Sequence, residues 1–467
     1  MTPPPAPTMA AHSNTSHGGR RRHVLLFPLP YQGHINPMFR LAGLLHARGF
    51  AITVFHTHFN APDPARHPDY RFVPVPDGSP VPVAIKDVVA QILELGVAFE
   101  ATFRDRLASV LEEYSRDAVA CLVADTHLLP IFEVAARLSV PTLALRTGSA
   151  ACCACFLAYP MLFEKGYLPV QESQRDRPVV ELPPYRVRDL LVIGEDDGGL
   201  VRELLSRAVT AVKTSSGLIL NTFDALERRE LEGLRRDLAA VPVFDVGPLH
   251  KLSPAGGDSS LLLPDRSCLE WLDAWPPESV LYVSFGSVAC MSPQDLVETA
   301  WGIAGSGVPF LWVVRPGMIS GSADDHRLPE GFEASTRERG KVVAWAPQEE
   351  VLRHRAVGGF WTHCGWNSTV ESVCEGVPML CRPYFGDQMG NARYVEHVWR
   401  VGLEVGGNLA LARGQVEAAI GRLMTDEEGD KMRVRAGELK KAAGECTGEG
   451  GSSRPAIDKL VTHMLAL

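Results

Sequence analysis

The stretch Val357–Glu371, VGGFWTHCGWNSTVE, runs from a short apolar segment through the loop His363-Cys364-Gly365-Trp366 into a helical segment that begins near Asn367. Asn and Ser are preferred at helix N-termini, and a glycine lets a ligand approach the backbone closely. Exposed N–H groups and the helix dipole at such a terminus favour a phosphate group. The stretch therefore predicts a strand, an anion-binding loop and a helix; the alternative is an ordinary capped helix.

Short apolar runs on both sides of this stretch alternate with helical segments. The runs that we predict as strands are residues 279–284, 309–314, 341–345, 357–362 and 377–382, preceded in the first half by 23–28, 50–55 and 118–124. Continuous apolar strands that alternate with helices indicate parallel sheets covered on both faces. The sequence therefore predicts an α/β fold of two Rossmann-like, doubly wound parallel-sheet domains that face each other across a cleft.

A segment rich in Pro, Gly, Ser and Asp interrupts the alternation at residues 248–266, as expected of a linker. We expect a disordered N-terminal tail at 1–22 and a first Rossmann-like domain at 23–247. Beyond the linker we expect a second Rossmann-like domain at 267–445, and a C-terminal segment at 446–467 that packs back on the first domain.

Composition places the chain among ordinary globular proteins. Its 467 residues are 46% apolar and 22% charged, and the formal net charge of -9 opposes binding to nucleic acid. The ten cysteines lack the spacing of a disulfide framework or metal site, so we expect reduced thiols. The tail has no apolar core of a signal peptide, and the longest apolar stretch, 147–163, is too short to span a bilayer. We expect a cytoplasmic protein without integral membrane association; an organellar transit peptide is the open alternative.

Two further loops carry groups suited to acid–base chemistry. His34 lies in PYQGHINP (30–37), directly after the first predicted strand, and Gly33 before it leaves room for a substrate. Asp125 follows the strand at 118–124. An imidazole can accept a proton from a hydroxyl near neutral pH, and a carboxylate bonded to its second nitrogen would fix its tautomer. Taken alone, His34 is equally typical of a structural histidine, and Asp125 of a helix N-cap.

The segment Trp345–Gln388 resembles the 44-residue signature box of plant family 1 UDP-dependent glycosyltransferases. The shared motifs are WxPQ at 345–348, HCGWNS at 363–368, Glu371, GVP at 376–378 and DQ at 387–388. The resemblance extends over almost all of the chain after the tail, including PYQGHINP and the SFGS loop at 284–287. It implies the GT-B fold, with an acceptor-binding domain at 23–247 and a UDP-sugar-binding domain at 267–445. It also implies an inverting transfer of the sugar to an acceptor hydroxyl.

The resemblance also implies roles for individual residues. The Trp345 indole would stack on uracil, and Glu371 would accept two ribose hydroxyls. His34 would be the general base, with Asp125 as its partner. The implied donor-binding residues are Gly33, Thr147, Ser287, Trp345, Ala346, Gln348, His363, Gly365, Trp366, Asn367, Ser368, Glu371, Asp387 and Gln388. Glutamine at the last position of the box accompanies glucose in this family, so the resemblance implies UDP-glucose.

The sequence contains no Asp-x-Asp pair, which metal-assisted sugar transfer commonly uses to hold its cation. We therefore expect no metal and no cofactor, with UDP-glucose as co-substrate, and a monomeric enzyme. A catalytically silent binder of nucleotide-sugars or small molecules, and a nucleotide-sugar epimerase or hydrolase on the same fold, are the alternatives.

The acceptor pocket should lie in the variable segments of the first domain. Its expected lining is aromatic and aliphatic: Phe99, Phe103, Phe156, Leu190 and Phe385. Such side chains favour a small hydrophobic metabolite with a hydroxyl group. The opening section also resembles the subgroup with benzoxazinoid and cytokinin glucosyltransferases, and flavonoids, terpenoids and trichothecenes stay open as acceptors.

Overall fold

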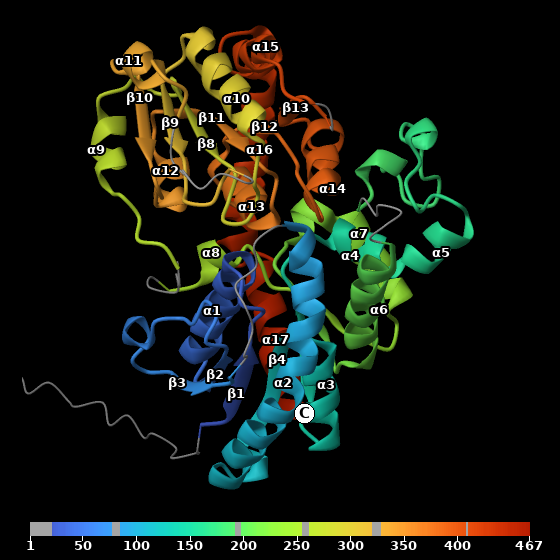
Figure 1. Cartoon of the computed structure of the whole chain (residues 1–467). Coiled ribbons are helices and arrows are strands. Elements are labelled where there is room, and N and C mark those ends of the chain that lie inside the picture. The colour runs from blue at the N-terminus through green and yellow to red at the C-terminus, as the bar shows by residue number, and fades with distance from the viewer. Residues whose placement is uncertain (1–20, 77–84, 192–197, 255–260, 320–327, 408–409) are drawn as a thin grey trace, which may run out of the picture.

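The computed structural model describes residues 21–76, 85–191, 198–254, 261–319, 328–407 and 410–467. Figure 1 shows two lobes stacked on each other, each built around a sheet with helices on its sides. Most of the predicted tail, and part of the predicted linker, lie outside the described residues. Within the described ranges, no helix combines the length and the apolar character needed to cross a membrane.

The first lobe contains a seven-stranded parallel sheet in the order β3-β2-β1-β4-β5-β6-β7. Its strands are β1 (His23–Phe27), β2 (Ala51–His56), β3 (Arg71–Pro74), β4 (Val119–Asp125), β5 (Thr142–Arg146), β6 (Leu218–Leu220) and β7 (Val243–Asp245). All seven residues of the central strand β4 are buried, as expected of a strand covered on both faces.

The second lobe contains a six-stranded parallel sheet in the order β10-β9-β8-β11-β12-β13. Its strands are β8 (Val280–Ser284), β9 (Phe310–Val313), β10 (Gly340–Val343), β11 (Val357–Thr362), β12 (Met379–Cys381) and β13 (Gly402–Glu404). The predicted α/β fold of two doubly wound domains is therefore confirmed. The sequence reading had not predicted β3, β6, β7 or β13.

Helices connect the strands and cover the sheets. In the first lobe they are α1 (Gln32–Ala47), α2 (Ile85–Glu113), α3 (Leu129–Arg137), α4 (Ala150–Leu157), α5 (Tyr159–Glu164), α6 (Gly198–Thr214) and α7 (Asp224–Asp237). The short helix α8 (Leu249–Leu252) lies within the predicted linker. In the second lobe they are α9 (Ser267–Asp273), α10 (Pro293–Ser306), α11 (Phe332–Thr336), α12 (Gln348–Arg353), α13 (Trp366–Glu375), α14 (Gln388–Arg393), α15 (Arg413–Met424) and α16 (Glu427–Thr447).

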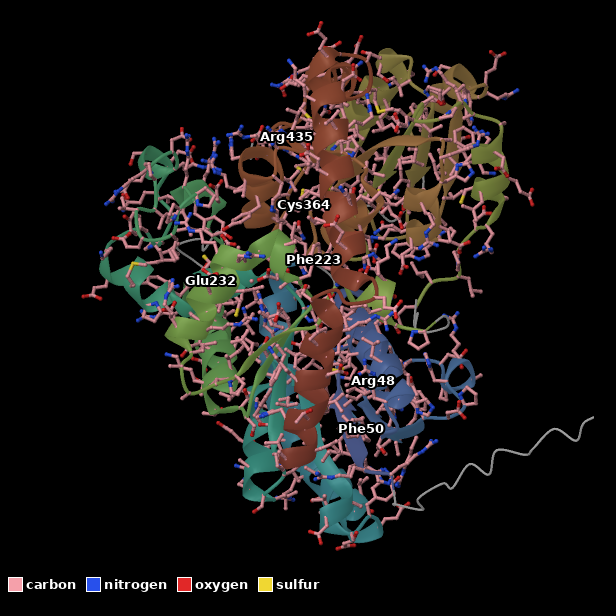
Figure 2. All side chains as sticks on the ribbon, turned by 180° about the vertical axis from the view of Figure 1, so that it is seen from behind. Arg48, Phe50, Phe223, Glu232, Cys364 and Arg435 are labelled. Atoms are coloured by element: carbon pink, nitrogen blue, oxygen red, sulfur yellow. The ribbon has the colours of Figure 1, made fainter. Side chains whose placement is uncertain are left out.

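The last helix, α17 (Ser453–Ala466), lies on the first lobe. Figure 2 shows the chain from behind, where α16, with Arg435 labelled, leads down into α17 near Arg48. Helix α17 contacts β7 and β4. Its residues Ile457, Leu460 and Met464 are buried in the core beside strand β1.

The strand order places a topological switch point in the middle of each sheet. The chain runs outward from β1 to β3 and then returns to the other side of β1 as β4; β8 and β11 are related in the same way. Ligands of open parallel sheets bind outside the carboxyl ends of the strands at such points. Residues 28–34 and Asp125 in the first lobe, and Ser284 and His363 in the second, belong to these ends.

Candidate active site

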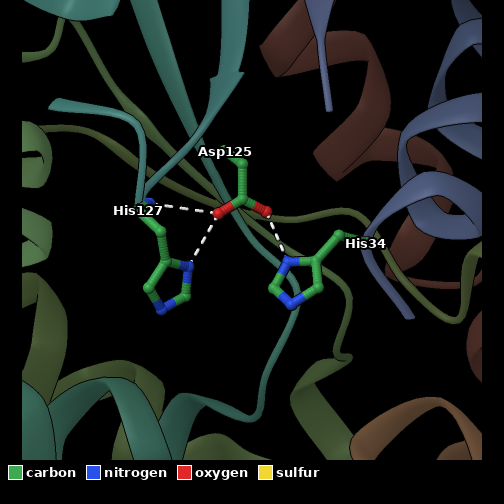
Figure 3. Close-up of side chains that lie close together, drawn as sticks. All are labelled: His34, Asp125 and His127. Carbon is green, nitrogen blue, oxygen red and sulfur yellow. Dashed lines mark hydrogen bonds and ion pairs between the residues drawn. The ribbon is translucent and has the colours of Figure 1, made fainter. Parts of the chain in front are cut away.

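His34 and Asp125 form a hydrogen-bonded pair at the switch point of the first sheet. His34 lies in the first turn of α1, Asp125 is the last residue of β4, and β1 and β4 are adjacent strands. His34 Nδ1 lies 2.6 Å from Asp125 Oδ2 (Figure 3). Burial alone would raise the pKa of Asp125, but His34 and His127 outweigh it and lower that pKa. Asp125 is therefore a carboxylate, and the Nε2 atom of His34 is the ring nitrogen not used by this pair.

A second histidine, His127, bonds the other oxygen of the same carboxylate. Its Nδ1 lies 2.8 Å from Asp125 Oδ1, and its backbone N–H donates to that oxygen at 3.1 Å. The guanidinium of Arg146, at the end of β5, lies 3.0 Å from His127 Nε2. The sequence reading assigned neither residue a role. Their position was the available signal. His127 follows the end of β4, and Arg146 ends the adjacent strand β5.

His34, Asp125 and His127 are also the one grouping of metal-ligand type found among the described residues. Their Nδ1 atoms and carboxylate oxygens lie 2.6 and 2.8 Å apart, which are hydrogen-bond distances. Each imidazole Nδ1 atom is thus paired with one oxygen of the Asp125 carboxylate. This arrangement fits a proton-transfer site whose carboxylate holds two imidazoles.

The loop before α13 forms the opposite side of the site. Gly365 is the N-cap of α13, and the ring of His363 lies between Gly365 and Gly286. A Cβ atom on Gly365 or Gly286 would lie 2.4 or 2.5 Å from that ring, so a side chain at either position would force the ring to move. Burial, with a contribution from Arg315, lowers the pKa of His363 to about 4. The ring is therefore neutral and can donate one N–H without carrying charge.

Two polar atoms of this loop are buried without a hydrogen-bond partner among the described residues. They are Nδ1 of His363 and Oδ1 of Asn367. Buried polar atoms are normally paired, so two unpaired atoms in residues that line the cavity are consistent with a polar ligand at the start of α13. The amide nitrogen of Asn367 is already engaged, since it donates to the carbonyl of Gly33 at 2.8 Å.

Gln348 and Glu371 are held together beside the same helix. Gln348 Nε2 donates to Ser368 Oγ at 2.9 Å and to Glu371 Oε2 at 2.8 Å. Arg40 of α1 donates to Glu371 Oε1 at 3.2 Å and also pairs with Glu349. The carboxylate expected to bind ribose is therefore fixed in orientation by one residue from each lobe.

The remaining expected donor-binding residues line one cavity with them. Trp345, Ala346, Ser287 and Thr147 all contribute to its walls. Thr147 Oγ1 lies 3.1 Å from His34 Nδ1, and the backbone carbonyl of Trp345 accepts from Asp265 at 2.9 Å. The structure thus places Trp345, which the resemblance implies as the partner of uracil, in the same cavity as His34, the implied general base.

Asp387 and Gln388 stand at the start of α14. The side-chain oxygen of Gln388 accepts from the backbone N–H groups of Tyr384 and Phe385 at 2.9 and 3.2 Å, which leaves its NH₂ group for another partner. Burial raises the pKa of Asp387, although Arg146 acts in the opposite direction.

Trp366 makes a lobe-to-lobe contact that the sequence reading had not predicted. Its indole N–H donates to the carbonyl of Asn221 in the first lobe at 2.8 Å. Because an indole has one donor, the ring N–H is not available to a sugar in this arrangement. A contact from Trp366 to the donor would have to come from its backbone.

The cavity between the lobes has a volume of about 990 Å³. Part of its apolar lining comes from α2, α6 and two separate aromatic residues: Val88, Val89, Ile92, Phe156, Leu200, Val201, Leu204, Leu205 and Phe385. His34, His127 and Arg146 supply polar groups beside this apolar part. The arrangement can hold an apolar molecule with one polar edge against the His34 imidazole.

Three expected acceptor residues do not line this cavity. Phe99 and Phe103 are 0% exposed and pack beside Phe27 and Phe55 in the core under the first sheet. Leu190 is also 0% exposed and belongs to a core cluster. The prediction for these three residues was wrong because apolar character alone does not distinguish the buried face of a segment from its cavity face.

Comparisons with known proteins agree with this geometry. The sequence profile described as "UDP-glucoronosyl and UDP-glucosyl transferase" matches residues 266–439. "DIMBOA UDP-glucosyltransferase BX8" of Zea mays is 52% identical over 93% of this chain and 96% of its own length. Os79 of O. sativa, solved with UDP, is 29% identical with a TM-score of 0.81 over 94% of this chain and 100% of its own. UGT2 of Phytolacca americana, solved with UDP-2fluoro-glucose and pterostilbene, is 29% identical with a TM-score of 0.80 over 95% and 99%.

These relatives match nearly the whole chain, and the solved ones share its two-lobed architecture. The likeness covers both lobes, so it includes the His34 side of the cavity as well as the signature box. The chain therefore belongs to the plant family 1 UDP-glycosyltransferases and is a glycosyltransferase enzyme of the GT-B fold.

Proposed function

We propose that this enzyme transfers glucose from UDP-glucose to a hydroxyl of a small hydrophobic plant metabolite, with inversion at the anomeric carbon. The observation that carries the proposal is that His34, paired with Asp125 in one lobe, and the Gly365–Asn367 loop of the other lobe line one cavity. The first supplies a proton acceptor and the second a helix N-terminus suited to a diphosphate.

The proposed reaction is a single displacement. The acceptor oxygen forms a bond to C1 of glucose while its proton passes to Nε2 of His34, and the bond from C1 to the UDP oxygen breaks with its electrons leaving on UDP. Asp125 stabilises the resulting imidazolium, as in other carboxylate–histidine pairs. The N-terminus of α13 and the neutral His363 ring stabilise the charge that develops on the diphosphate. No step requires a metal ion, and we propose that none is needed.

Glucose is proposed as the transferred sugar because of Gln388 and of the relatives. The relative from Zea mays is named as a UDP-glucosyltransferase, and the Phytolacca americana structure holds a UDP-glucose analogue. Asp387 and the free NH₂ group of Gln388 are the proposed partners of the sugar hydroxyls. Trp345, Gln348 and Glu371 are proposed to hold the nucleoside.

The proposed acceptor is a flat, apolar molecule that fits between α2 and α6. The aliphatic side chains of Val89, Ile92 and Leu204 with the ring of Phe156 would contact its faces. DIMBOA, named for the relative from Zea mays, is the first acceptor to assay. A cytokinin, a flavonol, a terpenoid alcohol and a trichothecene complete the panel. A monomeric state and a cytoplasmic location stay predictions.

The test measures UDP release from UDP-glucose with and without each acceptor. We expect release that depends on an acceptor, persists in excess EDTA and falls at least a hundredfold in His34→Ala, whereas UDP binding by His34→Ala stays within twofold of wild type. Release without an acceptor would instead indicate a hydrolase, and no release with any acceptor would favour a silent binder. Wild-type rates in His34→Ala would disprove the role of His34, and loss of activity in EDTA would disprove metal independence.

A further inference from the structure

Two histidines share the carboxylate of Asp125 in a nearly symmetrical way. His34 bonds Oδ2 at 2.6 Å and His127 bonds Oδ1 at 2.8 Å, each through Nδ1 (Figure 3). The backbone N–H of His127 adds a third bond, at 3.1 Å. Because both rings face the same cavity, the carboxylate alone does not decide which of them takes up a proton.

Arg146 makes the two histidines different. Its Nη1 lies 3.0 Å from Nε2 of His127. A guanidinium can only donate hydrogen bonds, so Nε2 of His127 must accept and Nδ1 must carry the proton. The contact thus selects the tautomer in which His127 donates to Asp125. No such cation caps Nε2 of His34 among the described hydrogen bonds.

The position of Arg146 is itself fixed. The residue ends β5, the strand next to β4, and its side chain is 6% exposed. Its guanidinium lies 4.1 Å above the ring of Phe156, and its Nη2 lies 3.4 Å from Cys152 Sγ. A buried cation held by an aromatic face and by α4 cannot leave His127 without disturbing this packing.

The environment of His127 also prevents it from acting as a base. Burial lowers its pKa to about 4, and the charge of Arg146 adds to this effect although Asp125 opposes it. At neutral pH the ring is uncharged, with its one proton directed to Asp125. His34 is left as the imidazole with a free nitrogen toward the cavity.

We propose that His127 is a positioning residue that turns the Asp125 carboxylate toward His34, and that Arg146 fixes the His127 tautomer that does so. The proposal rests on the role of His34 as base, given above. A carboxylate that is bonded at Oδ1 cannot rotate to present that oxygen to His34, and it shares its charge between two donors.

The charged and titratable groups around His34 come from three elements, namely β4 with the loop after it, β5 and the start of α14. Asp125 ends β4, His127 follows it with its ring centroid 5.5 Å from that of His34, and Asp387 precedes α14. Arg146 of β5 acts through His127. Replacing His127 therefore changes the hydrogen bonding of Asp125 while the other groups remain.

The test compares His127→Phe, which keeps a ring but loses both bonds, with His127→Asn, whose amide can replace Nδ1 as the donor to Asp125. In His127→Phe we expect kcat to fall at least tenfold while the KM for UDP-glucose stays within twofold. The acid limb of its pH–rate profile should move to higher pH, because protonated His34 then shares the Asp125 carboxylate with one donor fewer. In His127→Asn we expect kcat within threefold of wild type and an unmoved acid limb.

An unchanged kcat in His127→Phe, or an equal loss in both variants, would overturn the proposal. If His127→Phe does not fold, ¹⁵N NMR of the ring nitrogens gives a second measurement. Wild type should show His127 protonated at Nδ1, and Arg146→Met should show a mixture of both tautomers. Protonation of His127 at Nε2 in wild type would overturn the proposal, and this result needs no activity assay. If instead His34→Ala retains full activity, the role of His34 as base fails, whereas absence of acceptor-dependent UDP release from wild type would show that the proposed function fails.

Discussion

Three buried or half-buried imidazoles in this enzyme have different partners and therefore different chemistry. His34 bonds a carboxylate, His127 lies between a carboxylate and a guanidinium, and His363 lies between two glycines near Arg315. The pKa values of His127 and His363 are both lowered to about 4, chiefly by burial. Neutral rings serve as fixed donors, whereas a ring paired with an anion alone can receive a proton.

The lowered pKa of His127 makes a prediction about stability at the residue scale. Its pKa falls from 6.5 in the unfolded chain to about 4 in the folded enzyme, so unfolding takes up a proton between these values. Folded wild type should therefore lose stability relative to His127→Asn as the pH falls. Between pH 7.5 and 5.5 we expect the difference in unfolding free energy to shift by about 1.4 kcal/mol against wild type. Urea unfolding of both proteins at the two pH values measures it; a difference that does not change with pH would contradict the assignment.

At the residue scale, the sequence predicted the side chains of His34 and Asp125 near the ends of strands, but not the side chains of His127 and Arg146 that extend this hydrogen-bonded group. Asp125 ends a strand and the loop before His34 follows one, but only the family resemblance assigned these two residues a role; the structure places them 2.6 Å apart. His127 and Arg146 were missed because their contact depends on the register of β4 against β5. Phe99 and Phe103 were misplaced because only packing decides which face of α2 meets the core.

At the scale of elements, the turn after β8 fixes the His363 ring, on the side of the cavity where we propose that the diphosphate binds. Gly286 has a φ of 73°, and its carbonyl accepts from Arg315 Nε at 2.9 Å. A Cβ atom there would lie 2.5 Å from the His363 ring, and the ring would have to move to avoid this clash. The position of His363 thus depends on a glycine from another strand.

We predict that Gly286→Ala weakens UDP binding at least tenfold, because it displaces His363. Gly307→Ala is the matched control: Gly307 has a φ of 69° at the end of α10, but a Cβ there meets nothing within 4 Å. Both changes should cost about 1 kcal/mol of stability from left-handed backbone strain. Only Gly286→Ala should alter UDP affinity in calorimetric titration, and equal affinities for the two variants would refute the role of the turn.

Element prediction from the sequence was limited by strand length. The long apolar strands around β1, β4, β8 and β11 were predicted within one or two residues. The strands β6, β7 and β13 have three residues each, which is too short for a periodicity to stand out; β12 is equally short but lies within the longer stretch 377–382 that was predicted as a strand. These strands form because their backbone groups hydrogen-bond to neighbouring strands, which is a tertiary effect.

At the scale of the whole molecule, α17 ties the end of the chain to the first lobe. Leu460 is 0% exposed there, whereas Leu465 on the same helix is 51% exposed. We predict that Leu460→Ala lowers the free energy of unfolding by about 2–5 kcal/mol, as buried leucines generally do. Leu465→Ala should change it by less than about 0.5 kcal/mol. Urea unfolding followed by fluorescence distinguishes them, and equal midpoints would show that the helix does not contribute to the core.

The alternation of strands and helices was enough to predict two lobes, but it gave no information on their contacts. Trp366 to Asn221 and Asn367 to Gly33 each join the lobes by a hydrogen bond of 2.8 Å. These contacts depend on how two separately folded sheets are placed, which no local pattern encodes. They define a closed cleft in which groups from both lobes reach one substrate.

Arg40 is the charged member of this set, and its removal gives the last prediction. Its guanidinium is 5% exposed and pairs with Glu371, whose side chain is 7% exposed, and with Glu349. Removing one partner of a buried ion pair leaves an uncompensated charge. In Arg40→Met we therefore expect a less closed cleft, seen as a larger radius of gyration by X-ray scattering, and a KM for UDP-glucose at least fivefold higher.

Arg48→Met is the control for this prediction, because Arg48 pairs with Asp458 at the surface, where the two side chains are 32% and 64% exposed. Exposed pairs contribute about 0–1 kcal/mol, so both scattering and KM should stay as in wild type. UDP should restore part of the compactness of Arg40→Met, since the nucleotide is proposed to bind Glu371, the carboxylate that Arg40 of the other lobe contacts. If Arg40→Met matches Arg48→Met in both measurements, closure of the cleft does not depend on this ion pair and rests on other contacts between the lobes, among them the ion pair of Arg393 with Asp189 and the hydrogen bonds of Trp366 and Asn367.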